Sequence, residues 1–196
     1  MHKHFDNENF KNEFEIIDYL LNSNIETRAV DSFSLSFLKI EKQIRKIFTH
    51  IVYQHKCFEK SDRNKIIDIL SSNRNVFFID IINGINLIYN KEIKDIYGDN
   101  YDNDFNSINS LKVYRNKIFH GQLTGKKLKR EELIEFVKIM KSWSCQISKS
   151  FHDEINYDGF QRNSLTKSKK DFTELLKNKI QNIENFRELL LEMKVN

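Results

Sequence analysis

Three side chains able to handle a phosphate and a proton lie within six residues of one another: Arg115, Asn116 and His120. If this segment is helical, Asn116 and His120 are four residues apart and share one face. Arg115 lies about 140° round the helix from His120, but its long side chain can reach the same end. A guanidinium can bind a phosphate through two parallel hydrogen bonds, and a histidine can move protons near neutral pH. The spacing therefore predicts a polar cluster at one helix end.

These are the groups needed to cleave RNA without a metal ion. A base removes the proton of a ribose 2′-hydroxyl, the oxygen attacks the adjacent phosphate, and an acid protonates the departing 5′-oxygen. One histidine cannot easily be both base and acid, whereas a two-fold dimer would bring two copies of the cluster together. We therefore expect a composite site at a homodimer interface. Arg115 would bind the scissile phosphate, His120 would transfer protons, and Asn116 would orient these two side chains.

Basic residues gather around this cluster, in a chain whose net charge is only +4. Residues 111–130 contain no acidic residue and seven basic ones: Lys112, Arg115, Lys117, Lys126, Lys127, Lys129 and Arg130. Such a stretch suits a polyanion, because the cations displace counterions from phosphates. Lys117, Lys126 and Lys127 are therefore candidate RNA contacts. The alternative is a solvated basic loop.

A second Arg and His pair has the same spacing, at Arg45 and His50. This pair lies in the middle of an apolar helical pattern and has neither an adjacent Asn nor a following Gly. We interpret Arg45 as the partner of a carboxylate such as Glu41, one helical turn away. We interpret His50 as a structural histidine.

The sequence lacks the motifs of common cofactor and metal enzymes. It contains no HExxH, no Cys/His cluster, no glycine-rich nucleotide loop and no GxSxG, so we expect neither a cofactor nor a metal. Cys57 and Cys145 form no CxxC pair and are expected to be inert thiols of a reducing cytosol. The N-terminal residues lack the apolar segment of a signal peptide, and the sequence has no apolar run of about 18 residues, so we expect a cytoplasmic protein with no membrane partner.

Composition and apolar spacing predict an all-α fold. The 196 residues include no proline and only five glycines, which favours long helices. Apolar residues recurring every three or four positions predict helices at about 8–22, 31–53, 61–70, 76–88, 105–120, 131–151 and 172–190. The run VFFIDII at 76–82 is also compatible with a strand, although its neighbours favour a helix. Gly121 suits the end of the helix that carries the cluster.

The segment RNKIFHGQ, which begins at Arg115, resembles the R-N-x-x-x-H motif of the HEPN superfamily of α-helical ribonucleases. Two further segments are similar to a plasmid- and genome-borne bacterial HEPN subgroup of about this length. They are RAVDSFSLSFLKIEKQIRKIFTHIVYQ at 28–54 and YDGFQRNS at 157–164. In the second, Tyr157 and Phe160 could stack on a base. The alternative is a turn that ends a helix and is packed by its aromatic rings.

This resemblance implies an antiparallel helical bundle of HEPN type and a homodimer that cleaves RNA without a metal. Arg115 and His120 would be the catalytic pair, with Asn116 as the polar residue beside Arg115. Roles in bacterial defence or as a toxin are implied, with an antitoxin or defence-system protein as a partner. We expect a single domain over 1–196, with a core of about 25–165 and a C-terminal helical extension over 166–196. The alternatives are a non-catalytic HEPN module that binds RNA or a nucleotide, and a structural protein that assembles through its last helix.

Overall fold

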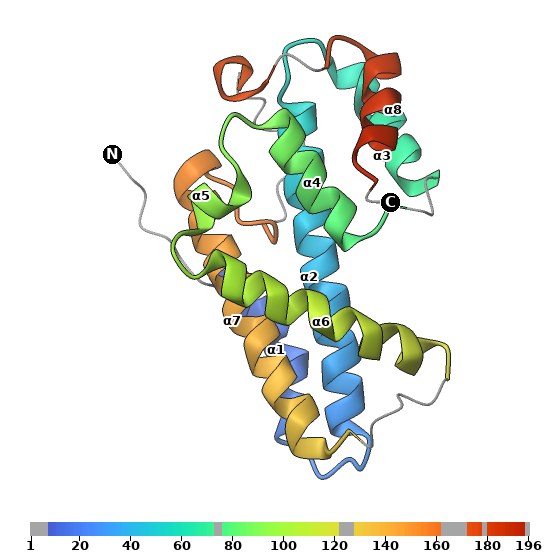
Figure 1. Ribbon diagram of the computed structural model, residues 1–196, viewed down its shortest axis with the longest axis vertical. Coiled ribbons are helices and arrows are strands. Elements are labelled where there is room, and N and C mark those ends of the chain that lie inside the picture. The colour runs from blue at the N-terminus through green and yellow to red at the C-terminus, as the bar shows by residue number, and fades with distance from the viewer. Residues whose placement is uncertain (1–7, 73–75, 122–127, 162–171, 178–179, 195–196) are drawn as a thin grey trace. The chain divides into compact units, whose positions relative to one another are not determined.

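The structure, a computed structural model, describes residues 8–72, 76–121, 128–161, 172–177 and 180–194 (Figure 1). Within these ranges the chain is helical and contains no β-strand, which confirms the predicted all-α fold. The α-helices are α1 (Glu8–Leu21), α2 (Arg28–Tyr53), α3 (Arg63–Ser72), α4 (Phe78–Ile88), α5 (Ile93–Tyr97), α6 (Tyr101–Phe119), α7 (Arg130–Ile155) and α8 (Ile183–Glu192). Two 3-10 turns cover Lys60–Asp62 and Thr173–Leu175. No helix in the described ranges is both long enough and apolar enough to cross a bilayer.

The ambiguous run at 76–82 is helical from Phe78 onward, so the favoured interpretation as a helix is confirmed and the strand alternative is wrong. α4 begins at Phe78, and the Asp80 carboxylate accepts a hydrogen bond from the backbone N–H of Phe77 at 2.7 Å. This bond satisfies one of the donors that every helix start leaves open. Seven of the eleven residues of α4 are buried, which explains why its apolar run is nearly continuous.

Two helices start four or more residues away from the predicted position. α6 begins at Tyr101 instead of about residue 105, because the buried Tyr101 ring stacks on Phe105 with 5.3 Å between ring centroids. The last helix begins at Ile183 instead of about residue 172. There the Asn182 side chain accepts a hydrogen bond from the backbone N–H of Asn185 at 2.8 Å and caps the helix.

The helices belong to two compact units, each described by itself. The first unit comprises Met1–Gln43 and Tyr97–Phe160, and so contains α1, the first part of α2, α6 and α7. α7 contacts both α1 and α6, and α6 crosses α7 (Figure 1). The fully buried side chains of the first unit include Phe14, Ile17, Phe33, Ile40, Ile108, Val137, Met140, Ile147 and Phe151. These are the apolar positions that the helical spacing places on inward faces.

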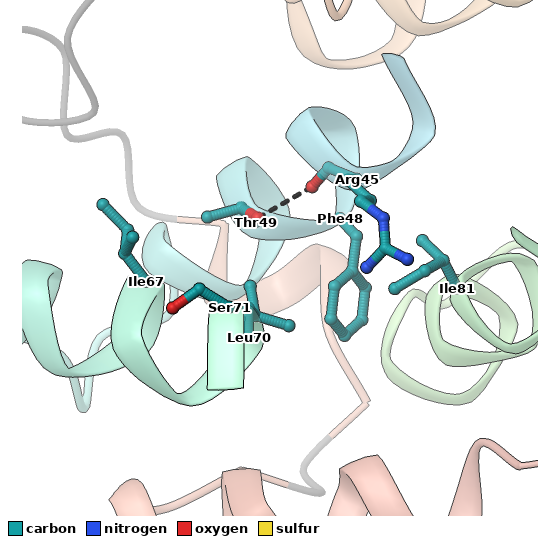
Figure 2. Close-up of a pocket in the computed structure, with 7 residues that line it drawn as sticks. All are labelled: Arg45, Phe48, Thr49, Ile67, Leu70, Ser71 and Ile81. Atoms are coloured by element: carbon teal, nitrogen blue, oxygen red, sulfur yellow. Dashed lines mark hydrogen bonds between the residues drawn. The ribbon is translucent and has the colours of Figure 1, made fainter. Parts of the chain in front are cut away.

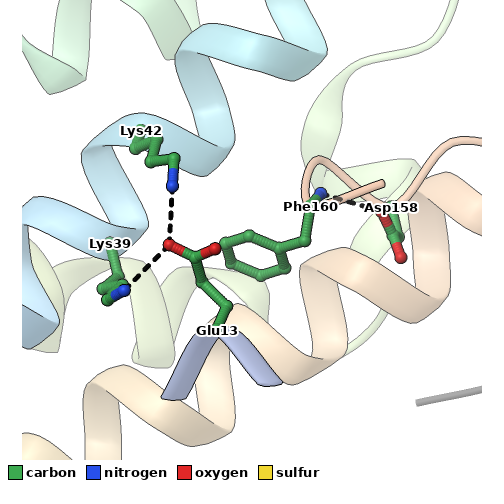
Figure 3. Close-up of polar contacts among 5 residues, drawn as sticks. All are labelled: Glu13, Lys39, Lys42, Asp158 and Phe160. Carbon is green, nitrogen blue, oxygen red and sulfur yellow. Dashed lines mark hydrogen bonds and ion pairs between the residues drawn. The ribbon is translucent and has the colours of Figure 1, made fainter. Parts of the chain in front are cut away.

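Charged side chains join α1 to α2 within this unit (Figure 3). One carboxylate oxygen of Glu13 accepts hydrogen bonds from Lys39 at 2.9 Å and from Lys42 at 2.7 Å. Partial burial on its own would raise the pKa of Glu13, but the two lysines outweigh it and hold the pKa below the ordinary value.

A buried polar network joins α2, α7 and the turn after α7. The Gln43 amide nitrogen donates to the Ser144 carbonyl, the Ser148 hydroxyl and the Asp158 carbonyl, at 2.8–3.2 Å. The Ser144 hydroxyl donates to the Gln43 amide oxygen at 2.7 Å. Because Gln43, Ser144 and Ser148 are fully buried, these bonds replace the water that their polar atoms lose on folding.

The second unit comprises Ile44–Ile96 and Gln161–Asn196. It contains the rest of α2, together with α3, α4 and α8. The Phe186 ring of α8 lies 6.3 Å from the ring centroids of both Phe48 and Phe58. Gly84 of α4 lies so close to Met193 and Phe48 that a β-carbon there would be 2.7–2.9 Å from their side chains. α8 is therefore packed against α2 and α4 in this unit. The predicted boundary between a core and a C-terminal extension stays a prediction.

Candidate active site

Arg115, near the end of α6, has its guanidinium fixed by polar and aromatic neighbours. Its Nη2 donates to Glu41 Oε2 of α2 at 3.0 Å, and its Nη1 donates to the side-chain oxygen of Asn116 at 2.9 Å. The guanidinium carbon lies 5.7 Å from the Phe37 ring centroid and 5.1 Å from that of Phe119. These contacts set both the plane and the direction of a cation that keeps 24% of its side-chain surface exposed.

His120 stands where α6 stops. Its backbone N–H donates to the Asn116 carbonyl at 3.1 Å, and it is the C-terminal cap residue of the helix. Gly121 follows with φ +62°, and its N–H donates to the Ile118 carbonyl at 3.1 Å. A left-handed residue that donates in this way is a common helix ending, so the predicted role of Gly121 is confirmed.

The side chains of the predicted cluster are only partly brought together. Arg115 and Asn116 are hydrogen-bonded to each other and half-buried, whereas His120 is exposed. Among the described residues, no hydrogen bond joins the His120 ring to Arg115 or Asn116. The arrangement thus offers an oriented cation with an amide beside it, and an imidazole presented to solvent at the same helix end. Such an imidazole can exchange protons with water or with a bound ligand.

The candidate RNA contacts can be located only in part. Lys117 is half-buried in the last turn of α6. Lys126 and Lys127 lie outside the described residues. Lys129 and Arg130 are exposed at the start of α7. The described part of the basic stretch therefore borders α6 at its C-terminal end and α7 at its N-terminal end.

The predicted pairing of Arg45 with Glu41 is wrong. Arg45 Nη2 donates to the backbone carbonyl of Val76, just before α4, and Glu41 forms its ion pair with Arg115. The rule that residues four apart on a helix interact is local, and here each side chain has found a partner from another segment. The interpretation of His50 as structural is confirmed, since it is only 6% exposed and its ring packs 5.9 Å from that of Phe172.

Sequence reasoning missed three residues that hold Arg115: Glu41, Phe37 and Phe119. Phe37 and Glu41 are four apart on α2, so one helical face supplies both the carboxylate and a ring. Phe119 is 48% exposed at the last position of α6, and no sequence pattern signalled that its ring would lie against the Arg115 guanidinium.

The segment at 157–160 closes the first unit and does not offer rings to a base. α7 ends at Ile155, its C-terminal cap residue Asn156 has φ +55°, and Gly159 has φ +83°. The Phe160 ring packs 6.1 Å from the Phe14 ring, and the Asp158 carboxylate accepts from the Phe160 backbone N–H at 2.8 Å (Figure 3). Tyr157 is 5% exposed, and this burial raises the pKa of its hydroxyl. The interpretation as a helix-ending turn packed by its aromatics is therefore confirmed.

The second unit has a cavity of about 410 Å³, in which a guanidinium faces apolar side chains (Figure 2). It is lined by Arg45, Phe48, Thr49, Ile67, Leu70, Ser71 and Ile81. One Arg45 nitrogen already donates to Val76, and the Thr49 hydroxyl donates to the Arg45 carbonyl at 2.7 Å. The Thr49 hydroxyl and one Arg45 nitrogen are thus engaged in holding α2 and the start of α4, and the Ser71 hydroxyl donates to the Asp68 carbonyl at 3.0 Å. None of the predicted site residues lines the cavity.

In the described ranges, no three His, Cys, Asp or Glu side chains are grouped closely enough to hold a metal ion. No protein-family model, no curated protein and no solved structure matches the chain.

Proposed function

We propose that the chain is an endoribonuclease of HEPN type that cleaves RNA without a metal ion. The observation that carries the proposal is the fixed Arg115 guanidinium, held by Glu41 and Asn116 at a helix end that also presents an exposed His120. A planar guanidinium can bind two oxygens of an RNA phosphate through parallel hydrogen bonds. The resemblance of RNKIFHGQ to the R-N-x-x-x-H motif supports the same assignment.

In the proposed reaction, Arg115 binds the scissile phosphate and stabilises the charge that builds up on it. His120 removes the proton of the 2′-hydroxyl or protonates the 5′-oxygen that leaves. The 2′-oxygen forms a bond to phosphorus while the bond to the 5′-oxygen breaks. The products are a 2′,3′-cyclic phosphate and a free 5′-hydroxyl. Asn116 keeps the guanidinium in its plane, and Lys117, Lys126 and Lys127 contact flanking phosphates.

The two proton transfers are assigned to two copies of His120 in a homodimer. Support comes from the geometry of a single chain, where His120 is exposed and is not bonded to the Arg115–Asn116 pair. A two-fold axis beside the end of α6 would place both imidazoles near one phosphate. Mass measurement in solution tests the dimer. Mixing the wild-type chain with increasing amounts of the His120→Ala chain tests the composite site. Because both imidazoles serve one phosphate, mixed dimers should be inactive, and cleavage per wild-type chain should fall as the share of the variant rises. A monomeric wild type together with undiminished cleavage per wild-type chain would contradict it.

A cleavage assay on end-labelled RNA in EDTA tests the activity. We expect Arg115→Ala and His120→Ala each to lower the rate at least about 100-fold, the scale of losing a general acid–base group or a phosphate clamp. His152→Ala is the matched control for a histidine outside the cluster, and Lys138→Ala is the control for an exposed cation. A substrate with a 2′-deoxyribose at the cleaved position should resist. Cleavage that survives both site variants would overturn the proposal.

A non-catalytic module that binds RNA or a nucleotide is the second candidate. One observation favours this candidate: among the described residues, no hydrogen bond joins the His120 ring to Arg115 or Asn116. Under this alternative, RNA binding is weakened by Arg115→Ala, is unaffected by His120→Ala, and leads to no cleavage. A role in bacterial defence or as a toxin, with an antitoxin partner, is part of the leading proposal. It predicts growth arrest on expression that either substitution relieves.

A further inference from the structure

The turn that follows α2 folds Cys57 back onto the ring of His55. The backbone N–H of His55 donates to the Val52 carbonyl, and that of Phe58 donates to the His55 carbonyl, both at 3.1 Å. These two bonds reverse the chain directly after the helix. As a result, two residues that are only two apart in sequence have their side chains in contact.

The contact joins a thiol to an imidazole nitrogen. Cys57 Sγ lies 2.9 Å from His55 Nδ1, and the backbone N–H of Cys57 donates to the same nitrogen at 3.3 Å. In the tautomer whose Nδ1 faces this backbone N–H, the ring nitrogen carries no proton and is the acceptor for the thiol proton. The Ile180 carbonyl, at 3.8 Å from Sγ, is the more distant acceptor. The sulfur thus has a base within direct reach.

The surroundings hold the imidazole in place and leave the sulfur accessible. His55 is 3% exposed, and its ring meets Phe58 edge-on with 6.4 Å between centroids. Cys57 is only partly buried and forms no disulfide. It lines a pocket of about 450 Å³ that also carries Lys65 and Arg187, and the carboxylates of Asp62 and Glu184. A pocket with charges of both signs suits a small zwitterion.

We propose that Cys57 is a nucleophilic thiol, activated by His55, that exchanges with small zwitterionic disulfides. The thiol proton passes to His55 Nδ1, and the thiolate attacks one sulfur of the disulfide. The disulfide bond breaks, a mixed disulfide forms on Cys57, and the departing thiolate takes up a proton. No other oxidant is required. This assignment differs from the expectation of two inert thiols, and it involves none of the residues assigned to RNA cleavage.

Alkylation by iodoacetamide tests the activation, with Cys145 as an internal control because it is also partly buried and reduced. At pH 6.5 we expect Cys57 to react at least about tenfold faster than Cys145, as followed by peptide mass spectrometry. In guanidinium chloride the two rates should become equal, because the turn is lost. His55→Gln should bring the folded-state rate of Cys57 down to that of Cys145. Equal rates in the folded wild type at every pH would overturn the proposal, whether or not the variant folds.

Two disulfides test the pocket. Glutathione disulfide carries ammonium and carboxylate groups, and bis(2-hydroxyethyl) disulfide is neutral. We expect Arg187→Gln to slow the reaction of Cys57 with glutathione disulfide several-fold while leaving the reaction with the neutral disulfide unchanged. Equal effects on both reagents, or a Cys57 that forms no mixed disulfide with either, would refute the selection for zwitterions.

Discussion

Glu41 of α2 fixes Arg115 of α6 through one ion pair, with 3.0 Å between Oε2 and Nη2. The two side chains are 16% and 24% exposed, so the pair is shielded from solvent over most of its surface. A pair in this setting interacts more strongly than one at a surface, and the loss of one partner leaves the other poorly solvated. Glu41 therefore bears both on the stability of the first unit and on the direction of the guanidinium.

Replacing Glu41 with Gln should lower the stability and, under the proposed function, the rate of RNA cleavage. We expect the free energy of unfolding to fall by about 1–3 kcal/mol, because the Arg115 charge loses its counter-charge in a half-buried place. Urea unfolding measures this change. Glu135→Gln is the matched control, since Glu135 pairs with Lys138 at an exposed site and should change stability by less than about 0.5 kcal/mol. Equal effects of the two variants would show that the Glu41 pair has no special role.

The ion pairs of Glu13 should make part of the stability depend on acid pH. Lys39 and Lys42 hold the pKa of Glu13 below its ordinary value of 4.5 in the folded chain. A carboxylate with a depressed folded-state pKa stabilises the fold fully above its unfolded pKa, and this contribution is lost as pH falls through the folded pKa. The stability difference between wild type and Glu13→Gln should thus be constant at neutral pH and shrink below about pH 4.5. A difference that does not vary between pH 7 and pH 3 would contradict this.

Gln43 should be the most sensitive polar position of the first unit. Gln43→Leu leaves the Ser144 hydroxyl buried without its acceptor, and it removes one partner each from the Ser148 hydroxyl and the Asp158 carbonyl, which keep only their bond to each other at 3.3 Å. We expect a loss of about 2–3 kcal/mol, because one buried group is unsatisfied and two others each lose a hydrogen bond. Gln146→Leu is the comparison. Its amide donates to the Tyr97 carbonyl in a half-buried place, so it should cost about 1 kcal/mol. Comparable losses for the two variants in urea unfolding would count against the network.

Gly84 should resist substitution because of its neighbours and not because of its backbone. In Gly84→Ala, the new β-carbon would meet Met193 Sδ at 2.7 Å and the Phe48 ring at 2.9 Å. We expect a loss of about 1–3 kcal/mol from overpacking, reduced by the better helix propensity of Ala. A double-mutant cycle with Met193→Ala should show positive coupling, because the smaller side chain makes room. Additive losses would mean that the contact with Met193 does not set the cost.

The helices were predictable because apolar residues recur at helical spacing, and burial on one face is a local property of the sequence. The two misplaced helix starts depended on single contacts, the ring stacking of Tyr101 on Phe105 and the cap at Asn182. Stacking of this kind cannot be read from spacing, since Tyr101 lies in a polar stretch that is typical of a loop.

The candidate site was predictable as a set of residues and less so as a geometry. The proximity of Arg115 and Asn116 follows from their adjacency in the sequence, and Gly121 correctly indicated where the helix ends. The sequence did not indicate that Glu41 is the partner of Arg115, because the two residues are 74 positions apart. Arg45 is a cation four residues from Glu41, so helical spacing favoured the wrong pair. The contact of Cys57 with His55 arises from a turn whose hydrogen bonds are made by the backbone, so no side-chain pattern signals it.

The first unit is built from two stretches of sequence that are far apart, and Asn9 donates to the carboxylate of Asp158 across 149 positions. On the ribosome, the apolar faces of α1 and α2 therefore emerge well before α6 and α7 exist to cover them. At ordinary elongation rates, the intervening hundred or so residues take on the order of 5–20 s to synthesise. During that interval the nascent chain exposes Phe10 and Phe14, which makes it a natural client of chaperones that bind apolar segments.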